Sequence, residues 1–187
     1  MGGCGQWKWT GGPDIRTIGS GNIGATNVLR TGNKKLAAAT LLLDAMKGAT
    51  AYLFILLTVG PGFALIAAFF TLLGHCFPLW LKFKGGKGVA TILGAYFAIN
   101  PLFGFAVCIV WLTVALIFKI SSLSALIALL LAPPLAWFFT GQEAVAFFCA
   151  LSLFIIYFKH RENIGRLLTG QEPKIGASSK TTGPTPR

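Results

Sequence analysis

Six apolar segments, separated by short connections, constrain the fold of this chain more than any other feature of its sequence. They lie at roughly 36–58, 62–81, 88–100, 101–119, 122–140 and 142–158. A straight membrane-spanning helix needs about 20 residues, and the third segment, with about 13, is clearly shorter. Because 55% of the 187 residues are hydrophobic and 11% are charged, the chain is too apolar for a soluble domain of this size. The sequence therefore predicts an all-α membrane protein, a polytopic bundle of about six transmembrane helices.

The lysines and arginines fall almost entirely on one side of this predicted bundle. If the connections alternate between the two sides, fifteen of the sixteen cations lie in residues 1–35, 82–88, 119–122 and 159–187. The opposite connections carry none, and the remaining cation, Lys47, lies inside a span. Cytoplasmic loops of membrane proteins are enriched in lysine and arginine, so this side is expected to face the cytoplasm. The net charge of +11 is explained in this way, and no nucleic-acid partner is expected.

The cysteines and the two ends of the chain carry little functional signal. The four cysteines are far apart and form no C-x-x-C pair: Cys4, Cys76, Cys108 and Cys149. Neither a disulfide framework nor a zinc site is therefore expected.

The sequence divides into three parts. Residues 1–13 form a divergent segment that cannot span a membrane, residues 14–170 are expected to be the membrane domain, and residues 171–187 are expected to be a disordered tail. Pro133 and Pro134 fall inside the fifth segment and predict a kink there.

A glycine-rich loop on the cationic side, KGGKGVAT at residues 84–91, has the composition of a phosphate-binding loop. Glycine lets backbone N–H groups approach an anion closely, and lysine adds positive charge. The loop does not fit the P-loop pattern G-x-x-x-x-G-K-[ST]. A second stretch, residues 14–32, contains G-x-G-x-x-G, but no βαβ unit can be built around it, so a dinucleotide-binding fold is not indicated. Its Ser20, Asn22 and Arg30 offer hydroxyl, amide and guanidinium groups to a phosphate or carboxylate.

A third polar stretch, HRENIGRLLTG at residues 160–170, follows the last apolar segment on the same side. Together with GSGNIGATNVLR and GHCFPLWLKFKGGKGVAT, it resembles the three motifs of the bacterial acyl-phosphate:glycerol-3-phosphate acyltransferases. The resemblance covers about Asp14 to Pro173. It implies a multi-pass enzyme of the bacterial inner membrane that transfers a fatty acyl group from acyl phosphate to the 1-hydroxyl of glycerol 3-phosphate, giving lysophosphatidic acid for phospholipid synthesis. The two substrates and membrane lipid would be its partners, with no cofactor, metal or obligatory protein partner and with the active site facing the cytoplasm.

The same resemblance implies roles for individual residues. Ser20, His160 and Asn163 are expected to be catalytic, and Glu162 is expected to be structural. The substrate-binding positions that the motifs imply are Asn22, Arg30, Lys84, Gly85, Gly86, Lys87, Gly88 and Ser122. Because acyl phosphate is already activated, the enzyme mainly has to orient a hydroxyl, neutralise phosphate charge and stabilise a developing oxyanion. The proton of that hydroxyl has two possible acceptors, His160 and the donor's own phosphate, and the sequence leaves both open.

Charged and titratable residues also lie within the apolar segments. Asp44 and Lys47, three residues apart in the first segment, share one helix face. Ionised groups inside a span tend to pair or to line a wet cavity, so an ion pair that fixes helix packing and a role toward substrate are both open. His75, near the end of the second segment, is expected to be a packing or interfacial residue.

Two other classes of protein remain open from the sequence. A transporter of an organic phosphate would also need cations and glycine breaks, although its polar groups should gather near the bilayer midplane. Members of the resembled family begin with a further apolar helix, which gives seven spans, so an inactive truncated member that serves as a membrane scaffold is the second alternative. The H-x-x-x-x-D signature of thioester-dependent acyltransferases and a G-x-S-x-G elbow are both absent from the sequence.

Overall fold

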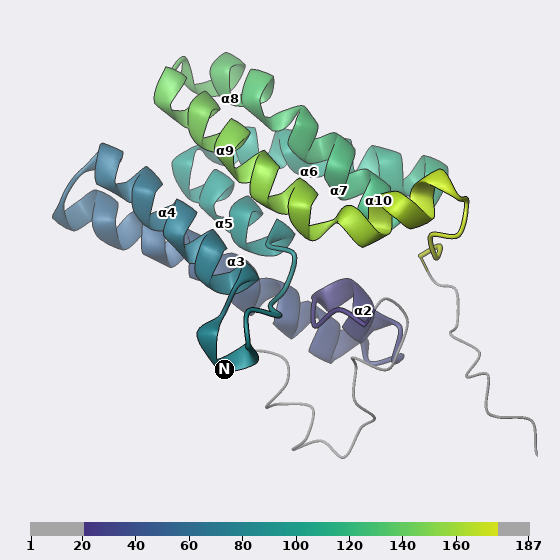
Figure 1. Ribbon diagram of the computed structural model, residues 1–187. Helices are drawn as coiled ribbons and strands as arrows, with labels where there is room; N and C mark the ends of the chain where they lie inside the picture. The colour runs from purple at the N-terminus through teal and green to yellow at the C-terminus, as the bar shows by residue number, and fades with distance from the viewer. Residues whose placement is uncertain (1–20, 176–187) are drawn as a thin grey trace, which may run out of the picture.

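The computed structural model describes residues 21–175, and all of their regular elements are helical (Figure 1). A short helix, α2 (Ala25–Leu29), precedes the long helix α3 (Lys34–Thr58). Asn33 caps α3, because its side chain accepts a hydrogen bond of 2.9 Å from the backbone N–H of Leu36. The later helices are α4 (Pro61–Cys76), α5 (Val89–Ile99), α6 (Pro101–Phe118), α7 (Ser121–Leu130), α8 (Ala132–Thr140), α9 (Glu143–Lys159) and α10 (Arg161–Leu168). A short 3-10 helix at Leu79–Leu81 follows α4.

The helices match the six predicted apolar segments. Three segments are long and apolar enough to cross a membrane, Lys34–Thr58, Pro61–Leu81 and Pro101–Phe118, and two bent helix pairs also qualify if each is one span. In the first pair, α7 and α8 meet at an angle of 46°, two residues before Pro133, so the predicted kink is confirmed. In the second pair, α9 and α10 meet at 66°. The prediction of an all-α polytopic membrane protein is confirmed.

The short helix α5 lies against α3 through two glycines. A Cβ atom on Gly48 would come within 1.9 Å of the carbonyl oxygen of Thr91, and one on Gly94 would come equally close to the carbonyl oxygen of Ala45. Small residues allow membrane helices to approach closely when the surrounding lipid is as apolar as their side chains. Tyr96 and its neighbours on α5 are buried as a result. Protein therefore covers most of this 11-residue helix, which is too short to cross the membrane in isolation.

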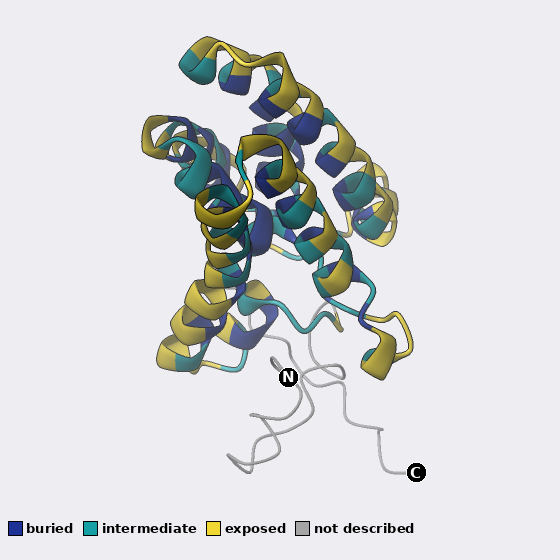
Figure 2. Ribbon diagram, turned by 90° about the vertical axis from the view of Figure 1, so that its left-hand side faces the viewer, coloured by how far each residue is buried: buried dark blue, intermediate teal, exposed yellow. Residues whose placement is uncertain are grey.

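The outer surface of the bundle is apolar. Figure 2 shows buried residues facing between the helices and exposed residues facing outward. Large exposed side chains such as Leu57, Phe70, Phe138 and Phe154 lie on this outer surface. A soluble protein rarely exposes so many large apolar side chains, whereas lipid tails solvate them. The outer surface of the helices is therefore suited to contact with lipid.

Candidate active site

The sequence motifs meet at a cavity of about 280 Å³. Its walls come from α2, the first half of α3, the end of α4, the start of α5, the middle of α6, the start of α7, the junction of α9 with α10 and the segment after α10. The lining residues that carry the argument below are Asn22, Arg30, Lys87, Ser122, His160 and Asn163. Thr26 on α2 lies 3.3 Å from Ser121 at the start of α7, measured between the hydroxyl oxygens, so the first helix reaches across to the later half of the chain.

The glycine-rich loop is folded tightly onto the end of α4. The backbone N–H groups of Gly85 and Gly86 donate to the carbonyl oxygens of Cys76 and His75, both at 3.2 Å. A Cβ atom on Gly86 would lie 2.1 Å from Nε2 of His75, and one on Gly85 would lie 2.2 Å from the His75 carbonyl oxygen. These two glycines therefore pack the loop against His75, and neither lines the cavity.

Lys87 and Gly88 are the loop residues that line the cavity. Gly88 is the N-cap of α5 with φ of 82°, a backbone conformation that favours glycine. Val89 and Ala90, in the first turn of α5, also line the cavity. The N-terminal N–H groups of a helix attract anions, so the lysine and the helix start place positive charge at the same corner of the cavity. Lys84 is exposed and does not line the cavity.

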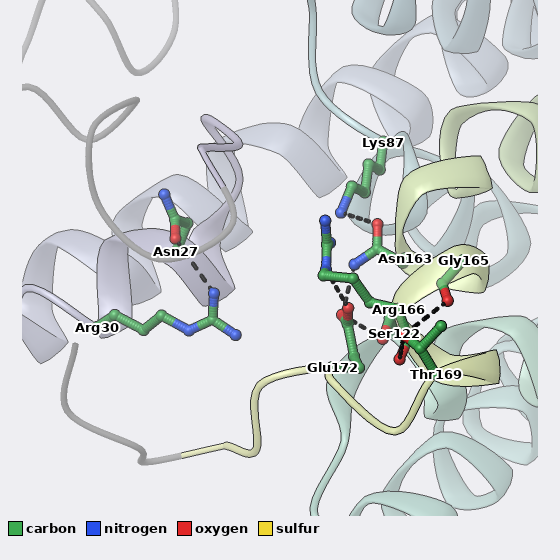
Figure 3. Close-up of polar contacts among 9 residues, drawn as sticks. All are labelled: Asn27, Arg30, Lys87, Ser122, Asn163, Gly165, Arg166, Thr169 and Glu172. Atoms are coloured by element: carbon green, nitrogen blue, oxygen red, sulfur yellow. Dashed lines mark hydrogen bonds and ion pairs between the residues drawn. The ribbon is translucent and has the colours of Figure 1, made fainter. Parts of the chain in front are cut away.

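Asn163, Glu172 and their partners form a polar network beside Lys87 (Figure 3). The Lys87 ammonium group donates to Oδ1 of Asn163, and Nδ2 of Asn163 donates to Oε1 of Glu172. Ser122 donates its hydroxyl hydrogen to the same Oε1 at 2.7 Å. Arg166 donates through Nε to Oε2, also at 2.7 Å. The network joins the loop before α5, the start of α7, helix α10 and the segment that follows α10.

Cations predominate around the Glu172 carboxylate. Burial lowers the pKa of Lys87 to about 8, against the opposing attraction of Glu172, so the ammonium form prevails at pH 7. Burial also lowers the pKa of Arg30, but a guanidinium stays charged at any physiological pH. Burial opposes ionisation of Glu172, yet hydrogen bonds from Ser122, Asn163 and Arg166 hold its pKa below the ordinary value. Three cations, Arg30, Lys87 and Arg166, thus face one buried carboxylate.

His160 is neutral and has a defined tautomer. It is 2% exposed and caps the end of α9, where the chain bends into α10. Its Nδ1 lies 2.8 Å from the carbonyl oxygen of Ile156. Because a carbonyl can only accept, Nδ1 carries the hydrogen and Nε2 keeps its lone pair. Burial and the nearby Lys87 charge lower the pKa of His160 to about 4, so the ring is an uncharged hydrogen-bond acceptor at neutral pH.

The first motif contributes Asn22 and Arg30 to the cavity wall, while Ser20 lies outside the described residues. Arg30 donates to Oδ1 of Asn27 at 3.4 Å. Asn27 is only 2% exposed and also lines the cavity; the sequence places it among the amides of the first motif but gives it no role in the site. A buried amide is costly unless it is hydrogen-bonded, and Arg30 supplies one such hydrogen bond to Asn27.

Asp44 and Lys47 form the ion pair that their spacing allows, with 2.7 Å between Nζ and Oδ1. Asp44 also lies 3.7 Å from Nδ1 of His75. Asp44 and His75 both line the 280 Å³ cavity and a second cavity of about 330 Å³, and Lys47 lines only the second. His75 therefore has contacts on two sides: the glycine-rich loop packs against it on one side, and Asp44 lies beside it on the other.

The carboxylates near the third motif correct the prediction for the tail. Glu162 is exposed, and within residues 21–175 it makes no side-chain hydrogen bond or ion pair. Glu172, by contrast, is buried in the network although the tail from residue 171 was expected to be disordered. The backbone N–H of Gln171 donates to the carbonyl oxygen of Arg166, and that of Ile175 donates to the carbonyl oxygen of Lys119, both at 2.7 Å. Residues 171–175 are therefore folded against the helices, and Glu172 is the residue of this segment that lines the cavity.

The other wall of the cavity is apolar. It includes Leu41, Leu93, Cys108, Trp111 and Ala125, which lie on helices α3, α5, α6 and α7. A cavity with cations at one wall and apolar side chains at another suits a molecule that combines a phosphate with an acyl chain. Among residues 21–175, no group of three His, Cys, Asp or Glu side chains is arranged to hold a metal ion.

Fold and site together define a class: a polytopic membrane protein with a cavity whose walls are cationic on one side and apolar on another. The chain belongs to the glycerol-3-phosphate acyltransferase family, whose model matches residues 3–170. The glycerol-3-phosphate acyltransferase of Rhizobium etli is 54% identical over 164 residues, which are 88% of this chain and 79% of that protein. That of Dinoroseobacter shibae is 54% identical over 167 residues, covering 89% of this chain and 82% of the relative. The family resemblance seen in the three motifs is confirmed.

Solved structures agree with this assignment. The crystal structure of PlsY, described as an integral membrane glycerol 3-phosphate acyltransferase in its glycerol 3-phosphate form, superposes with a TM-score of 0.87 at 36% identity. The match covers 93% of this chain and 88% of PlsY. A second structure of PlsY, in its lysophosphatidic acid form, superposes with a TM-score of 0.84. The predictions of a membrane-integral fold and of an acyltransferase are confirmed.

Proposed function

We propose that the 280 Å³ cavity transfers a fatty acyl group from acyl phosphate to the 1-hydroxyl of glycerol 3-phosphate and so forms lysophosphatidic acid. The observation that carries this proposal is the meeting of Lys87, Arg30 and neutral His160 beside an apolar wall. The names of the relatives support glycerol 3-phosphate as the acceptor. The donor is argued from chemistry: an acyl phosphate needs no covalent enzyme intermediate, because phosphate is already a good leaving group.

The residues divide the work of this reaction. Lys87, Arg30 and the start of α5 bind phosphate oxygens, because charge-assisted hydrogen bonds to a phosphate are strong and directional. Nε2 of His160 accepts a hydrogen bond from the acceptor's hydroxyl and aims its oxygen at the acyl carbon. The hydroxyl oxygen then bonds to that carbon while the bond from the carbon to the phosphate oxygen breaks. Ser20 is proposed to act at the same centre, as the first motif implies.

The proton of the hydroxyl is proposed to end on the departing phosphate. With a pKa of about 4, His160 is a weak base at neutral pH, because effective general bases have a pKa near the working pH. The phosphate oxygen that leaves the acyl carbon gains negative charge as the bond breaks and becomes a far stronger base than the imidazole. His160 therefore orients the hydroxyl, and the donor supplies the final proton acceptor.

An assay with purified protein tests the proposed reaction. The protein in detergent is expected to form lysophosphatidic acid from palmitoyl phosphate and radiolabelled glycerol 3-phosphate, and to form none when palmitoyl coenzyme A replaces the acyl phosphate. Protein reconstituted in sealed vesicles distinguishes the alternatives. A transporter would move labelled glycerol 3-phosphate into the vesicles without product, and an inactive scaffold would neither move label nor form product. Either result would exclude the proposed reaction.

The membrane orientation is part of the same proposal: the cavity faces the cytoplasm from the bacterial inner membrane. The cation distribution supports it, since Lys84, Lys87, Arg161 and Arg166 flank the cavity and the opposite connections carry no cation. Cysteines introduced at Val59 and Gln142, both exposed, are expected to react with a membrane-impermeant maleimide in intact cells. A cysteine at Lys84 should react only after the cells are opened. The unmodified chain gives the background labelling, and labelling of all three sites from outside would contradict this orientation.

A further inference from the structure

We propose that Glu172 is a positioning residue for the transfer, which acts through Asn163 to aim the Lys87 ammonium group at the substrate phosphate. This inference rests on the proposed function of the cavity. Glu172 lies beyond the three sequence motifs and beyond the residues that the family model matches, and its side chain is only 4% exposed. Both of its carboxylate oxygens accept hydrogen bonds, one from Ser122 and Asn163 and the other from Arg166.

The Glu172 carboxylate decides which way the Asn163 amide points. An ionised carboxylate can only accept hydrogen bonds, so Nδ2 of Asn163 must face it. Oδ1 of the same amide then faces the opposite way, toward the Lys87 ammonium group that donates to it. The reversed amide would place its NH₂ group against an ammonium and its oxygen against a carboxylate, and both contacts would be repulsive. Glu172 therefore sets the acceptor that holds Lys87.

Glu172 also separates Arg166 from the cavity. Arg166 does not line the cavity, whereas Glu172, Asn163 and Lys87 do. The Nε–H group of Arg166 donates a hydrogen bond to Oε2 of Glu172, the oxygen that does not accept from Asn163. The lysine, by contrast, uses one of its three N–H groups on Asn163 and keeps the others for a ligand. The two cations therefore have different roles: Arg166 holds the Glu172 carboxylate in place, and Lys87 remains available to the substrate.

The backbone on both sides of Glu172 is anchored. Gln171 donates to Arg166 of α10, and Ile175 donates to Lys119 at the turn between α6 and α7. This five-residue segment runs from the end of α10 to that turn, with Glu172 directed into the site (Figure 3). A side chain that is held from both sides loses little further freedom when substrate binds. The carboxylate is therefore pre-positioned before the substrate arrives.

The test compares Glu172→Gln and Glu172→Asp with the unmodified protein. The glutamine variant has nearly the same shape but no charge, so it is expected to lower kcat/KM for glycerol 3-phosphate by roughly 10- to 100-fold. Loss of the nearby negative charge also lowers the pKa of Lys87 further below its value of about 8. The alkaline limb of the pH profile of kcat/KM should therefore move to lower pH, by on the order of one unit. Gln171→Ala, a neighbour with an exposed side chain, serves as the matched control and should behave like the unmodified protein.

The aspartate variant separates the effect of the negative charge from the effect of side-chain length. It keeps the negative charge but is one methylene shorter, so it should lower kcat/KM while the alkaline limb stays near its original pH. Monodispersity and thermal unfolding in detergent establish that each variant is folded. A folded glutamine variant with an unmoved alkaline limb, or a loss explained wholly by unfolding, would overturn the inference. If the glutamine variant does not fold, a folded aspartate variant with unchanged kcat/KM would overturn it equally. The unmodified protein must be active in the same assay, and its inactivity would count against the proposed function instead.

Discussion

Replacing Lys87 with alanine is expected to raise KM for glycerol 3-phosphate by roughly 10- to 100-fold, because the variant lacks a charged hydrogen bond to the substrate phosphate. The side chain reaches the cavity from the start of α5 and is held by Asn163. Removing an interaction made equally in the bound substrate and in the transition state should leave kcat less affected. The measurement is a full kinetic matrix in which both substrates are varied. KM for acyl phosphate should change less than KM for the acceptor.

The neighbouring Lys84 provides the comparison. The family motif places both lysines at the substrate, but Lys84 is exposed and does not line the cavity. Lys84→Ala should therefore have a much smaller effect on either KM than Lys87→Ala. Equal losses from the two variants, or an equal loss toward both substrates, would show that position 87 does not form the acceptor's phosphate site.

The charge of Lys87 also sets a pH dependence. Its pKa is lowered to about 8, so the ammonium group is present below that pH and is lost as pH rises through it. A phosphate monoester is already a dianion there, since its second pKa is about 6. KM for glycerol 3-phosphate should thus rise above pH 8 in the unmodified protein, and this rise should be absent in Lys87→Ala.

Much of the fold follows from the sequence, for a physical reason. A lipid environment forces each apolar segment to satisfy its backbone hydrogen bonds internally, so helix positions can be predicted from hydropathy alone. The one-sided cations predict that the three motifs share a face, and the structure brings Arg30, Lys87 and His160 to one cavity. The two adjacent prolines predicted the bend that the structure shows between α7 and α8. The sequence does not show how deeply each motif residue is buried.

Glu172 and His75 show why the rest could not be predicted. Glu172 lies in a stretch whose composition is typical of disorder, and only contacts with distant residues, Ser122 among them, make it part of the site. In the sequence, His75 is only a residue near the end of a helix, but in the structure the loop packs directly against it at Gly85 and Gly86. Composition and spacing describe neighbours in the chain, whereas both roles arise from residues that are distant in sequence. An acidic residue just after a motif, in a chain with only five acidic residues, was the available signal for Glu172.

Replacing His160 is expected to reduce kcat by roughly 100-fold for alanine, with a smaller loss for glutamine. The reason is the neutral ring, whose Nε2 accepts a hydrogen bond and orients the attacking hydroxyl. Alanine removes that acceptor, whereas the glutamine side-chain oxygen can supply one. Thermal unfolding of both variants is the necessary control, because Nδ1 of the native ring is bonded to the carbonyl oxygen of Ile156 and that bond helps to end α9.

The comparison of alanine with glutamine distinguishes the two possible proton acceptors. If the departing phosphate takes the proton, a residue that orients the hydroxyl without basicity should retain part of kcat, and glutamine should exceed alanine by about tenfold. If His160 itself takes the proton, both variants lack the base and should be equally slow. Equal kcat values for two well-folded variants would assign the proton to His160 and contradict the proposed transfer to the donor phosphate.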